Sequence, residues 1–213
     1  DTWVFMMMEN RTYDHYLGAR KLVEGLPGDG LVAGMTNPDL AGNDVALWPA
    51  TDPTMCVIDP PHGWDRSREQ FNGGAMDGFV RAHEASSGSP LEPMQYMLRE
   101  HLPVTNALAD AYASCDRWFA SVMGPTLPNR MYWHAATSNG ATNNDDIIAG
   151  AYAGVNTLYH NLDAKGVDWA YYYGDVPVLG VLDIPTEGRL KRFLYDFIDD
   201  AAAGRLPPVV YID

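Results

Sequence analysis

The chain has 213 residues, 46% of them hydrophobic, which is enough for one substantial core without requiring a second full domain. Its formal net charge of −14 would repel nucleic acid and anionic membranes, so neither is an expected partner. No apolar stretch is long enough to cross a bilayer, so we expect no stable membrane anchor. Cys56 and Cys115 form no disulfide framework, and either one bridge or two buried thiols would suit them.

The chain begins with the apolar segment TWVFMMM (residues 2–8), which is typical of a strand buried on both faces of a parallel sheet. From about Gly18 to Gly74 the sequence is rich in Gly, Pro, Asn and Asp, a composition typical of loops and hairpins around a site. Both ends of the chain have the composition of core strands, whereas domain ends are usually exposed and polar. The sequence therefore predicts a piece of a longer polypeptide.

Helix and strand patterns alternate from about Pro103 onward. The sequence predicts helices over 103–115, 129–140, 156–166 and 189–204, and strands over 116–123, 167–173 and 208–212. In the first of these helices, Val104, Leu108 and Ala111 form the expected apolar positions. The alternation predicts an α/β fold, a three-layer α/β/α sandwich with a mainly parallel sheet.

Thr126 lies in the predicted turn GPTLP, between a predicted strand and a predicted helix. Backbone N–H groups and the helix dipole favour negative charge at such a point, and a threonine activated by a metal ion can attack phosphorus there. The alternative, favoured by local sequence alone, is that Thr126 caps the helix, with Pro128 in the first turn. Asn129 and Arg130 can likewise cap and pair structurally or contact an anionic substrate.

Glu9 and Asn10 directly follow the first predicted strand, where ligands bind in open α/β sheets. Their oxygen atoms suit Mg²⁺, Ca²⁺ or Mn²⁺, or zinc in an oxygen-rich site. The alternative is a polar turn in which Glu9 pairs with Arg11.

Histidines offer further candidates. His62, in a polar loop after two prolines, can bind a phosphoryl oxygen or protonate a leaving group, although a hydrogen-bonded loop histidine is the commoner case. His15 is expected to anchor its turn through Asp14, and His134 to pack in the core. The motifs of serine hydrolases, P-loop nucleotidases, zincins and Rossmann dehydrogenases are absent from the sequence. No spaced acid pair supports a carbohydrate-active enzyme.

Four segments in this order carry a resemblance: MMENRTYDHYLG (7–18), PPHGWDRSREQFNGGAMDGFV (60–80), ALADAYASCDRWFASVMGPTLPNRMY (107–132) and WAYYYGD (169–175). Together they resemble the bacterial phosphoesterase family of phosphatidylcholine-hydrolysing phospholipases C and related acid phosphatases, in the alkaline phosphatase-like superfamily. The resemblance covers essentially the whole chain but only the amino-terminal part of a family member. It implies that residues 1–213 form the first part of a single phosphoesterase catalytic domain.

The resemblance also implies roles for individual residues. Thr126 corresponds to the nucleophile, Glu9 and Asn10 to metal-site residues beside it, and His62 to a histidine of the phosphate pocket. Asp14 and His15 match a motif with a mainly structural role.

Two departures from the family pattern matter. Arg68 stands where many members have a second histidine, and Arg68 cannot readily transfer a proton. The acidic metal-ligand pair and the further histidine that the family places downstream do not occur within these 213 residues.

The resemblance thus implies a metal-dependent phosphoric ester hydrolase that acts on a small phosphoester or a phospholipid headgroup. Its expected partners are a divalent metal ion and the carboxy-terminal part of the polypeptide, and it is expected in the periplasm or outside the cell. The alternative is a non-catalytic anion-binding module of the same fold. A phosphocholine headgroup would need a cation-binding pocket, which aromatic residues can line, although most of the candidates are expected in the core: Trp64, Trp133, Tyr171, Tyr172 and Tyr173.

Overall fold

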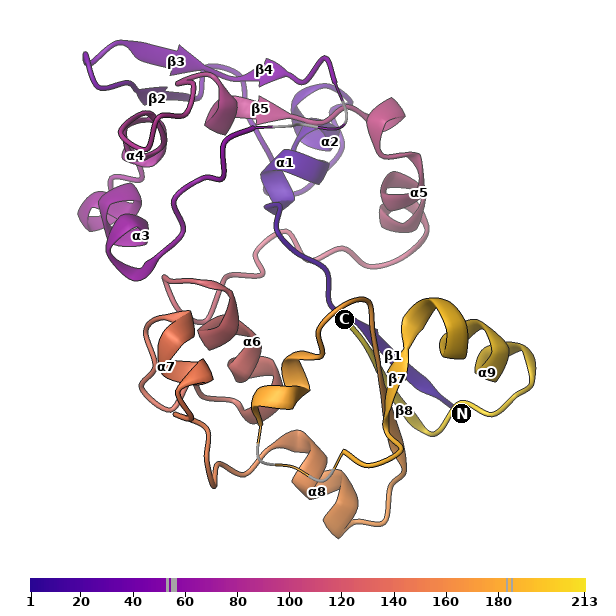
Figure 1. Ribbon diagram of the computed structural model, residues 1–213. Coiled ribbons are helices and arrows are strands. Elements are labelled where there is room, and N and C mark those ends of the chain that lie inside the picture. The colour runs from indigo at the N-terminus through magenta and orange to yellow at the C-terminus, as the bar shows by residue number, and fades with distance from the viewer. Residues whose placement is uncertain (53, 55–56, 183, 185) are drawn as a thin grey trace. The chain divides into compact units, whose positions relative to one another are not determined.

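The computed structural model describes residues 1–52, 54, 57–182, 184 and 186–213, which divide into two compact units (Figure 1). Unit 1 consists of Asp1–Glu9 and Gly124–Asp213, and unit 2 of Asn10–Met123. Unit 1 therefore joins the two ends of the chain, whereas unit 2 is one continuous segment.

Unit 1 is built around a parallel sheet with the strand order β1–β8–β6–β7. Its strands are β1 (Trp3–Met6), β6 (Trp169–Tyr173), β7 (Leu190–Arg192) and β8 (Val209–Ile212). The register pairs Trp3 with Val209, and Tyr171 with Tyr211. Because the strands are parallel, their carboxyl ends meet at one edge, where Glu9 follows β1 and Asp213 follows β8.

Helices pack on both faces of this sheet. The helices of unit 1 are α6 (Thr126–Ala135), α7 (Asn144–Ile148), α8 (Leu158–Ala164), α9 (Ile198–Ala202), a 3-10 turn (Val178–Val181) and a π-helical turn (Phe193–Phe197). Met131 of α6 packs on the face that carries Tyr171 and Tyr211. Phe193 and Phe197 pack on the opposite face, which carries Tyr172.

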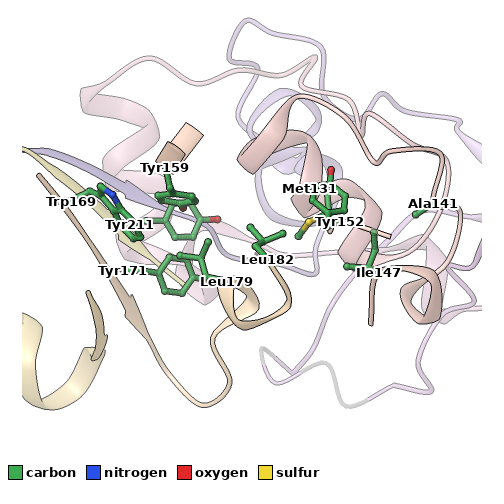
Figure 2. Close-up of a cluster of buried hydrophobic side chains, with 10 residues drawn as sticks. All are labelled: Met131, Ala141, Ile147, Tyr152, Tyr159, Trp169, Tyr171, Leu179, Leu182 and Tyr211. Atoms are coloured by element: carbon green, nitrogen blue, oxygen red, sulfur yellow. The ribbon is translucent and has the colours of Figure 1, made fainter. Parts of the chain in front are cut away.

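The main core of unit 1 is aromatic (Figure 2). Tyr171 and Tyr211 stack with ring centroids 4.9 Å apart, and Tyr159 lies 4.5 Å from Trp169. Tyr171 and Tyr172 are both fully buried, so the expectation that most of the candidate aromatic residues belong to the core is confirmed for these two.

Unit 2 contains short elements around several small apolar clusters. β2 (Thr36–Pro38) and β3 (Asp44–Ala46) form an antiparallel hairpin, and β4 (Trp48–Pro49) pairs in parallel with β5 (Gln95–Tyr96). The helices are α1 (Tyr13–Leu17), α2 (Ala19–Leu22), α3 (Trp64–Phe71), α4 (Phe79–Glu84) and α5 (Pro103–Ala111), with 3-10 turns at Asn72–Gly74, Glu92–Met94 and Arg99–His101.

Several sequence predictions are confirmed. The first strand, the strands 167–173 and 208–212, and the helix within 156–166 are present, and the sheet of unit 1 is parallel. Thr157 caps α8 by accepting a hydrogen bond from the His160 N–H, and Gly166 follows the helix with a φ of 65°. The fold is therefore α/β, as the alternation predicts.

The burial expected of the first strand is wrong. Trp3, Val4 and Met6 are exposed. Phe5 and Met7 pack against the main core of unit 1, so β1 is covered on one face instead of both.

Two predictions fail at the boundary between the expected first helix and the following strand. Residues 116–123 form no strand. In this segment Asp116 accepts a hydrogen bond from the Asp29 N–H at 2.7 Å, and Arg117 pairs with Asp29. In α5, Val104 and Leu108 face outward. Other contacts hold that helix: ion pairs from Asp110 to Arg20 and Arg99, and the burial of Asn106.

Two predicted helices have different ends. The helix expected over 189–204 begins later, because residues 190–192 pair with β6 as β7. The helix expected from Asn129 begins at Thr126 and ends at Ala135, and the next residue, Ala136, adopts a φ of 57°.

None of the helices in the described ranges is long and apolar enough to span a membrane. The bridge considered for Cys115 involves Cys56, which lies outside the described residues.

Candidate functional site

Thr126 and Glu9 come together at the carboxyl edge of the unit 1 sheet. The Thr126 hydroxyl donates a hydrogen bond to Glu9 Oε1 at 3.0 Å. Thr126 is the first residue of α6, and Pro125 occupies the cap position without a side-chain cap. The interpretation of Thr126 as a helix cap is therefore wrong, because its hydroxyl reaches the Glu9 carboxylate instead of a helix N–H.

Arg130 lies one turn further along α6 and contacts two carboxylates. Its Nε donates to Glu9 Oε2 at 3.0 Å, and its Nη1 pairs with Asp213 Oδ1. Burial alone would lower the pKa of the guanidinium, but the hydrogen bond and charge of Asp213 and the charge of Glu9 raise it overall. Arg130 therefore stays charged. Its contacts are ion pairs with Glu9 and Asp213, as expected of a structural role, and its contact with an anionic substrate stays a prediction.

Asp213 is held from its other side by Tyr171. The Tyr171 hydroxyl donates to Asp213 Oδ2, so each carboxylate oxygen of Asp213 has its own partner. Burial raises the pKa of Tyr171, and the hydrogen bond to Asp213 raises it further. Sequence reasoning missed both residues. The signal for Asp213 was available, since it follows an apolar strand directly, as the Glu9–Asn10 pair does.

The turn before α6 is fixed by two asparagines. Asn129 Nδ2 donates to the carbonyls of Gly124 and Pro125, both at 3.1 Å, and Asn144 Oδ1 accepts from the Leu127 N–H at 2.9 Å. These bonds hold the backbone that carries Thr126. Asn129 thus bonds to the backbone of this turn, and its contact with substrate stays a prediction.

Asn10 and His62 belong to unit 2, so a shared site with Thr126 stays a prediction for both. Asn10 Oδ1 accepts a hydrogen bond from Arg11 Nη1 at 2.7 Å, so Arg11 pairs with Asn10 and not with Glu9. His62 is exposed, and its Nδ1 lies 2.8 Å from the Pro60 carbonyl. Because a carbonyl only accepts, Nδ1 carries the proton, and Nε2 is the nitrogen that can exchange one in the neutral ring.

Arg68 does not take the place of a catalytic histidine. Its guanidinium lies over the Trp64 ring, 3.2 Å from the centroid, and donates to the carbonyls of Trp64 and Met123. These contacts give Arg68 a packing role within unit 2.

The other histidines have structural settings. His134 is completely buried and its Nδ1 lies 3.1 Å from the Tyr159 hydroxyl, which confirms the expected core role. His15 lies in α1, where its backbone N–H donates to the Thr12 hydroxyl at 3.2 Å. His83 forms a buried pair with Glu92 at 2.5 Å that the sequence did not indicate.

Glu9 and Thr126 offer oxygen atoms of the type that cation sites use. Glu9 and Thr126 place a carboxylate and a hydroxyl oxygen together, and such oxygens suit hard divalent cations. Within the described ranges, no group of three or more His, Cys, Asp or Glu side chains is arranged to hold a metal ion. The donor set therefore fits a divalent cation in chemical type, and further ligands would be needed to complete it.

A threonine hydroxyl at a helix start and a carboxylate lie together at the carboxyl edge of the parallel sheet, the edge at which open α/β proteins bind their ligands. Comparison with known proteins identifies the family. The chain matches the Phosphoesterase family over residues 1–213, and it belongs to that family.

The chain is also similar to individual proteins named as phospholipases C. Over 97% of its length, the chain is 32% identical to non-specific phospholipase C1 of Arabidopsis thaliana, covering 41% of that protein. It is 32% identical to non-specific phospholipase C3 of the same plant over 100% of the chain and 44% of that protein. It is 29% identical to phospholipase C A of Mycobacterium tuberculosis over 98% of the chain and 48% of that protein. The chain thus spans about half the length of the curated relatives it matches.

Proposed function

We propose that this chain is the amino-terminal part of a metal-dependent phosphoric ester hydrolase in which Thr126 is the nucleophile. The observation that carries the proposal is the hydrogen bond of 3.0 Å from the Thr126 hydroxyl to Glu9 at the start of α6. Membership of the Phosphoesterase family and the names of the phospholipase C relatives support the same reaction class.

The reaction would proceed in two displacements. The Thr126 oxygen attacks phosphorus, an O–P bond forms, and the bond to the ester oxygen breaks so that the alcohol leaves with a proton. Water then attacks the phosphothreonine, which releases phosphate or a phosphomonoester and restores the Thr126 hydroxyl. Glu9 orients the hydroxyl by accepting its hydrogen bond, and Arg130 holds the Glu9 carboxylate in place through the Nε–H bond to Oε2.

A divalent cation held by Glu9 and Thr126, with Asn10 as a predicted further ligand, would supply a lowered hydroxyl pKa and neutralise charge on the phosphoryl oxygens. His62 is proposed to bind a phosphoryl oxygen or to protonate the leaving alcohol. Asn129 is proposed to contact the substrate anion through the same turn.

The finer assignments rest on the family resemblance. We propose an alkaline phosphatase-like three-layer sandwich, a phosphodiester with a phosphocholine-type headgroup as substrate, and a periplasmic or secreted location. The helices on both faces of the unit 1 sheet support the layering. A phosphomonoester substrate, as for an acid phosphatase, remains the competing specificity.

Turnover of p-nitrophenyl phosphorylcholine and p-nitrophenyl phosphate tests the proposal. We expect Thr126→Ala to lower both rates by at least about a hundredfold, because no second hydroxyl replaces the nucleophile. Thr157→Ala is the matched control: it removes the hydroxyl that caps α8 and should cost about 1 kcal/mol of stability without changing turnover. Equal rates in wild type and Thr126→Ala would exclude Thr126 as the nucleophile.

The alternative is a non-catalytic anion-binding module, favoured by the incomplete donor set among the described residues. Calorimetric titration with Mn²⁺ and with inorganic phosphate distinguishes the two functions. Phosphate binding without turnover in the presence of Mn²⁺ would support the module, whereas turnover that requires Mn²⁺ would support the hydrolase.

A further inference from the structure

Five side chains form a continuous series from the proposed nucleophile into the core. Thr126 donates to Glu9 Oε1 at 3.0 Å, and Arg130 Nε donates to Glu9 Oε2 at 3.0 Å. Arg130 Nη1 pairs with Asp213 Oδ1, and the Tyr171 hydroxyl donates to Asp213 Oδ2. We call these contacts the Thr126–Tyr171 series.

The outer end of the series would be mobile without the inner end. The Glu9 side chain is 40% exposed, so its carboxylate can rotate unless another group fixes it. Arg130, at 11%, and Asp213, at 7%, are nearly buried. Because Arg130 holds Oε2 of Glu9, the other oxygen of the same rigid carboxylate faces the Thr126 hydroxyl.

Tyr171 is the rigid end of the series. It is completely buried in the middle of β6, its ring stacks on Tyr211, and its backbone pairs with β8. The hydroxyl occupies one oxygen of Asp213 and leaves the other for Arg130. Without it, Asp213 Oδ2 would lose a buried hydrogen bond, and the carboxylate could rotate toward a second guanidinium nitrogen.

We propose that Tyr171 is a positioning residue: through Asp213 and Arg130 it fixes the Glu9 carboxylate that orients the Thr126 hydroxyl. The consequence for catalysis rests on the proposed function of Thr126. The effect of Tyr171 on the Arg130–Glu9 hydrogen bond is independent of that function, because it follows from the contacts of Tyr171, Asp213 and Arg130.

The neighbouring residue provides a matched control. Tyr172 is also completely buried, and its hydroxyl donates to the Asp200 carboxylate at 2.8 Å. Successive strand residues point to opposite faces of a sheet, and Tyr172 belongs to the core on the face opposite Tyr171. Asp200 pairs with Lys191 and Arg205, which lie outside the Thr126–Tyr171 series.

The first measurement reports the contact directly and needs no turnover. In ¹⁵N-labelled protein, the signal of the Arg130 Nε–H proton is assigned by its loss in Arg130→Lys, and its exchange with water is measured. We expect Tyr171→Phe to speed this exchange about tenfold or more, as the hydrogen bond to Glu9 opens more often. Tyr172→Phe should leave it within about twofold of wild type. Equal exchange in the two variants would overturn the proposal.

The second measurement tests the catalytic consequence with p-nitrophenyl phosphate. We expect Tyr171→Phe to lower kcat by about tenfold with KM nearly unchanged, as for loss of a supporting residue behind a reactive group. Tyr172→Phe should retain kcat, although both variants lose one buried hydroxyl–carboxylate bond. If Thr126→Ala is inactive but both tyrosine variants have wild-type kcat, Tyr171 has no positioning role. If Thr126→Ala is fully active, the proposed nucleophile is wrong, and the exchange rates still decide the link between Tyr171 and Arg130.

Discussion

Arg130 is the residue on which the charge balance of the site depends. It lies between Glu9 and Asp213, and both it and Asp213 are nearly buried. An isolated carboxylate in such a place is costly, since water cannot replace the lost partner.

We expect Arg130→Met to destabilise the protein by about 3 kcal/mol, because it leaves Asp213 buried without its cation. Urea unfolding at pH 7 measures the change in the free energy of unfolding. Arg66→Met is the control: Arg66 forms an exposed pair with Glu69, and its loss should cost less than about 1 kcal/mol. Similar losses in the two variants would show that the Arg130 pairs behave as surface ion pairs.

His134 predicts how stability depends on pH. Burial lowers the pKa of His134 from 6.5 to about 4 in the folded protein, while the charge of Asp213 opposes this and that of Arg130 adds to it. As the pH falls, the unfolded chain therefore binds this proton before the folded protein does. Stability should decline between about pH 6.5 and pH 4, by up to about 3 kcal/mol from this group.

The measurement is urea unfolding of wild type and His134→Gln at pH 7.5, 5.5 and 4.5. The variant loses packing at every pH, but the difference between the two proteins should shrink as the pH falls below about 6.5. The difference between the two proteins should not change between pH 7.5 and 8.5, where the imidazole is neutral in both states. A constant difference from pH 7.5 to 4.5 would contradict the lowered pKa.

At the scale of elements, the sequence predicted those strands and helices whose local pattern agrees with their packing in the fold. The strand 167–173 and the helix within 156–166 have strong patterns, and each is stabilised by local caps or by the central sheet. Residues 116–123 have an equally apolar pattern, but Asp116 and Arg117 bind to Asp29 and no strand forms. The contacts of this segment are with residues distant in sequence, and a local sequence pattern does not predict such contacts.

The approach of α3 to α4 in unit 2 depends on a glycine. A Cβ atom on Gly78 would lie 2.1 Å from the Glu69 carbonyl oxygen, which belongs to the backbone of α3. The Gly78 N–H also donates to the Gln70 carbonyl at 3.2 Å, so the two helices meet without room for a side chain.

We expect Gly78→Ala to cost about 3 kcal/mol, because the backbone must shift to relieve the clash. Thermal and urea unfolding measure this loss. Gly180→Ala is the control: its new methyl group would be nearest to Pro177 Cγ at 4.0 Å, and its effect should stay within about 1 kcal/mol. Equal stability of wild type and Gly78→Ala would mean that the two helices separate freely.

At the scale of the whole molecule, the sequence predicted the α/β class and one contact of the site. The rule that ligands bind beyond the carboxyl ends of strands selected both Glu9 and Thr126, and the structure brings them within 3.0 Å. The links from Arg130 to Asp213 and Tyr171 were not predicted. Burial and register determine which charges meet across such long separations, and neither is visible in a local motif.

The proposed cation leads to a prediction for the molecule as a whole. We expect EDTA to lower hydrolysis of p-nitrophenyl phosphate by at least about tenfold, and Mg²⁺, Mn²⁺, Ca²⁺ or Zn²⁺ to restore it. Folding should depend on the cation only weakly, because Arg130 already pairs with Glu9 and Asp213 without one. Circular dichroism before and after chelation checks the fold. Full activity in EDTA would exclude a readily exchanged catalytic metal.

The pairing of β1 with β8 has a consequence for synthesis on the ribosome. Trp3 pairs with Val209, so β1 leaves the ribosome long before its neighbour exists. At typical rates of synthesis, the first strand waits on the order of 10–40 s for its pairing partner. Unit 2 is continuous in sequence and can begin to fold during this interval. Unit 2 should therefore fold before unit 1 during synthesis.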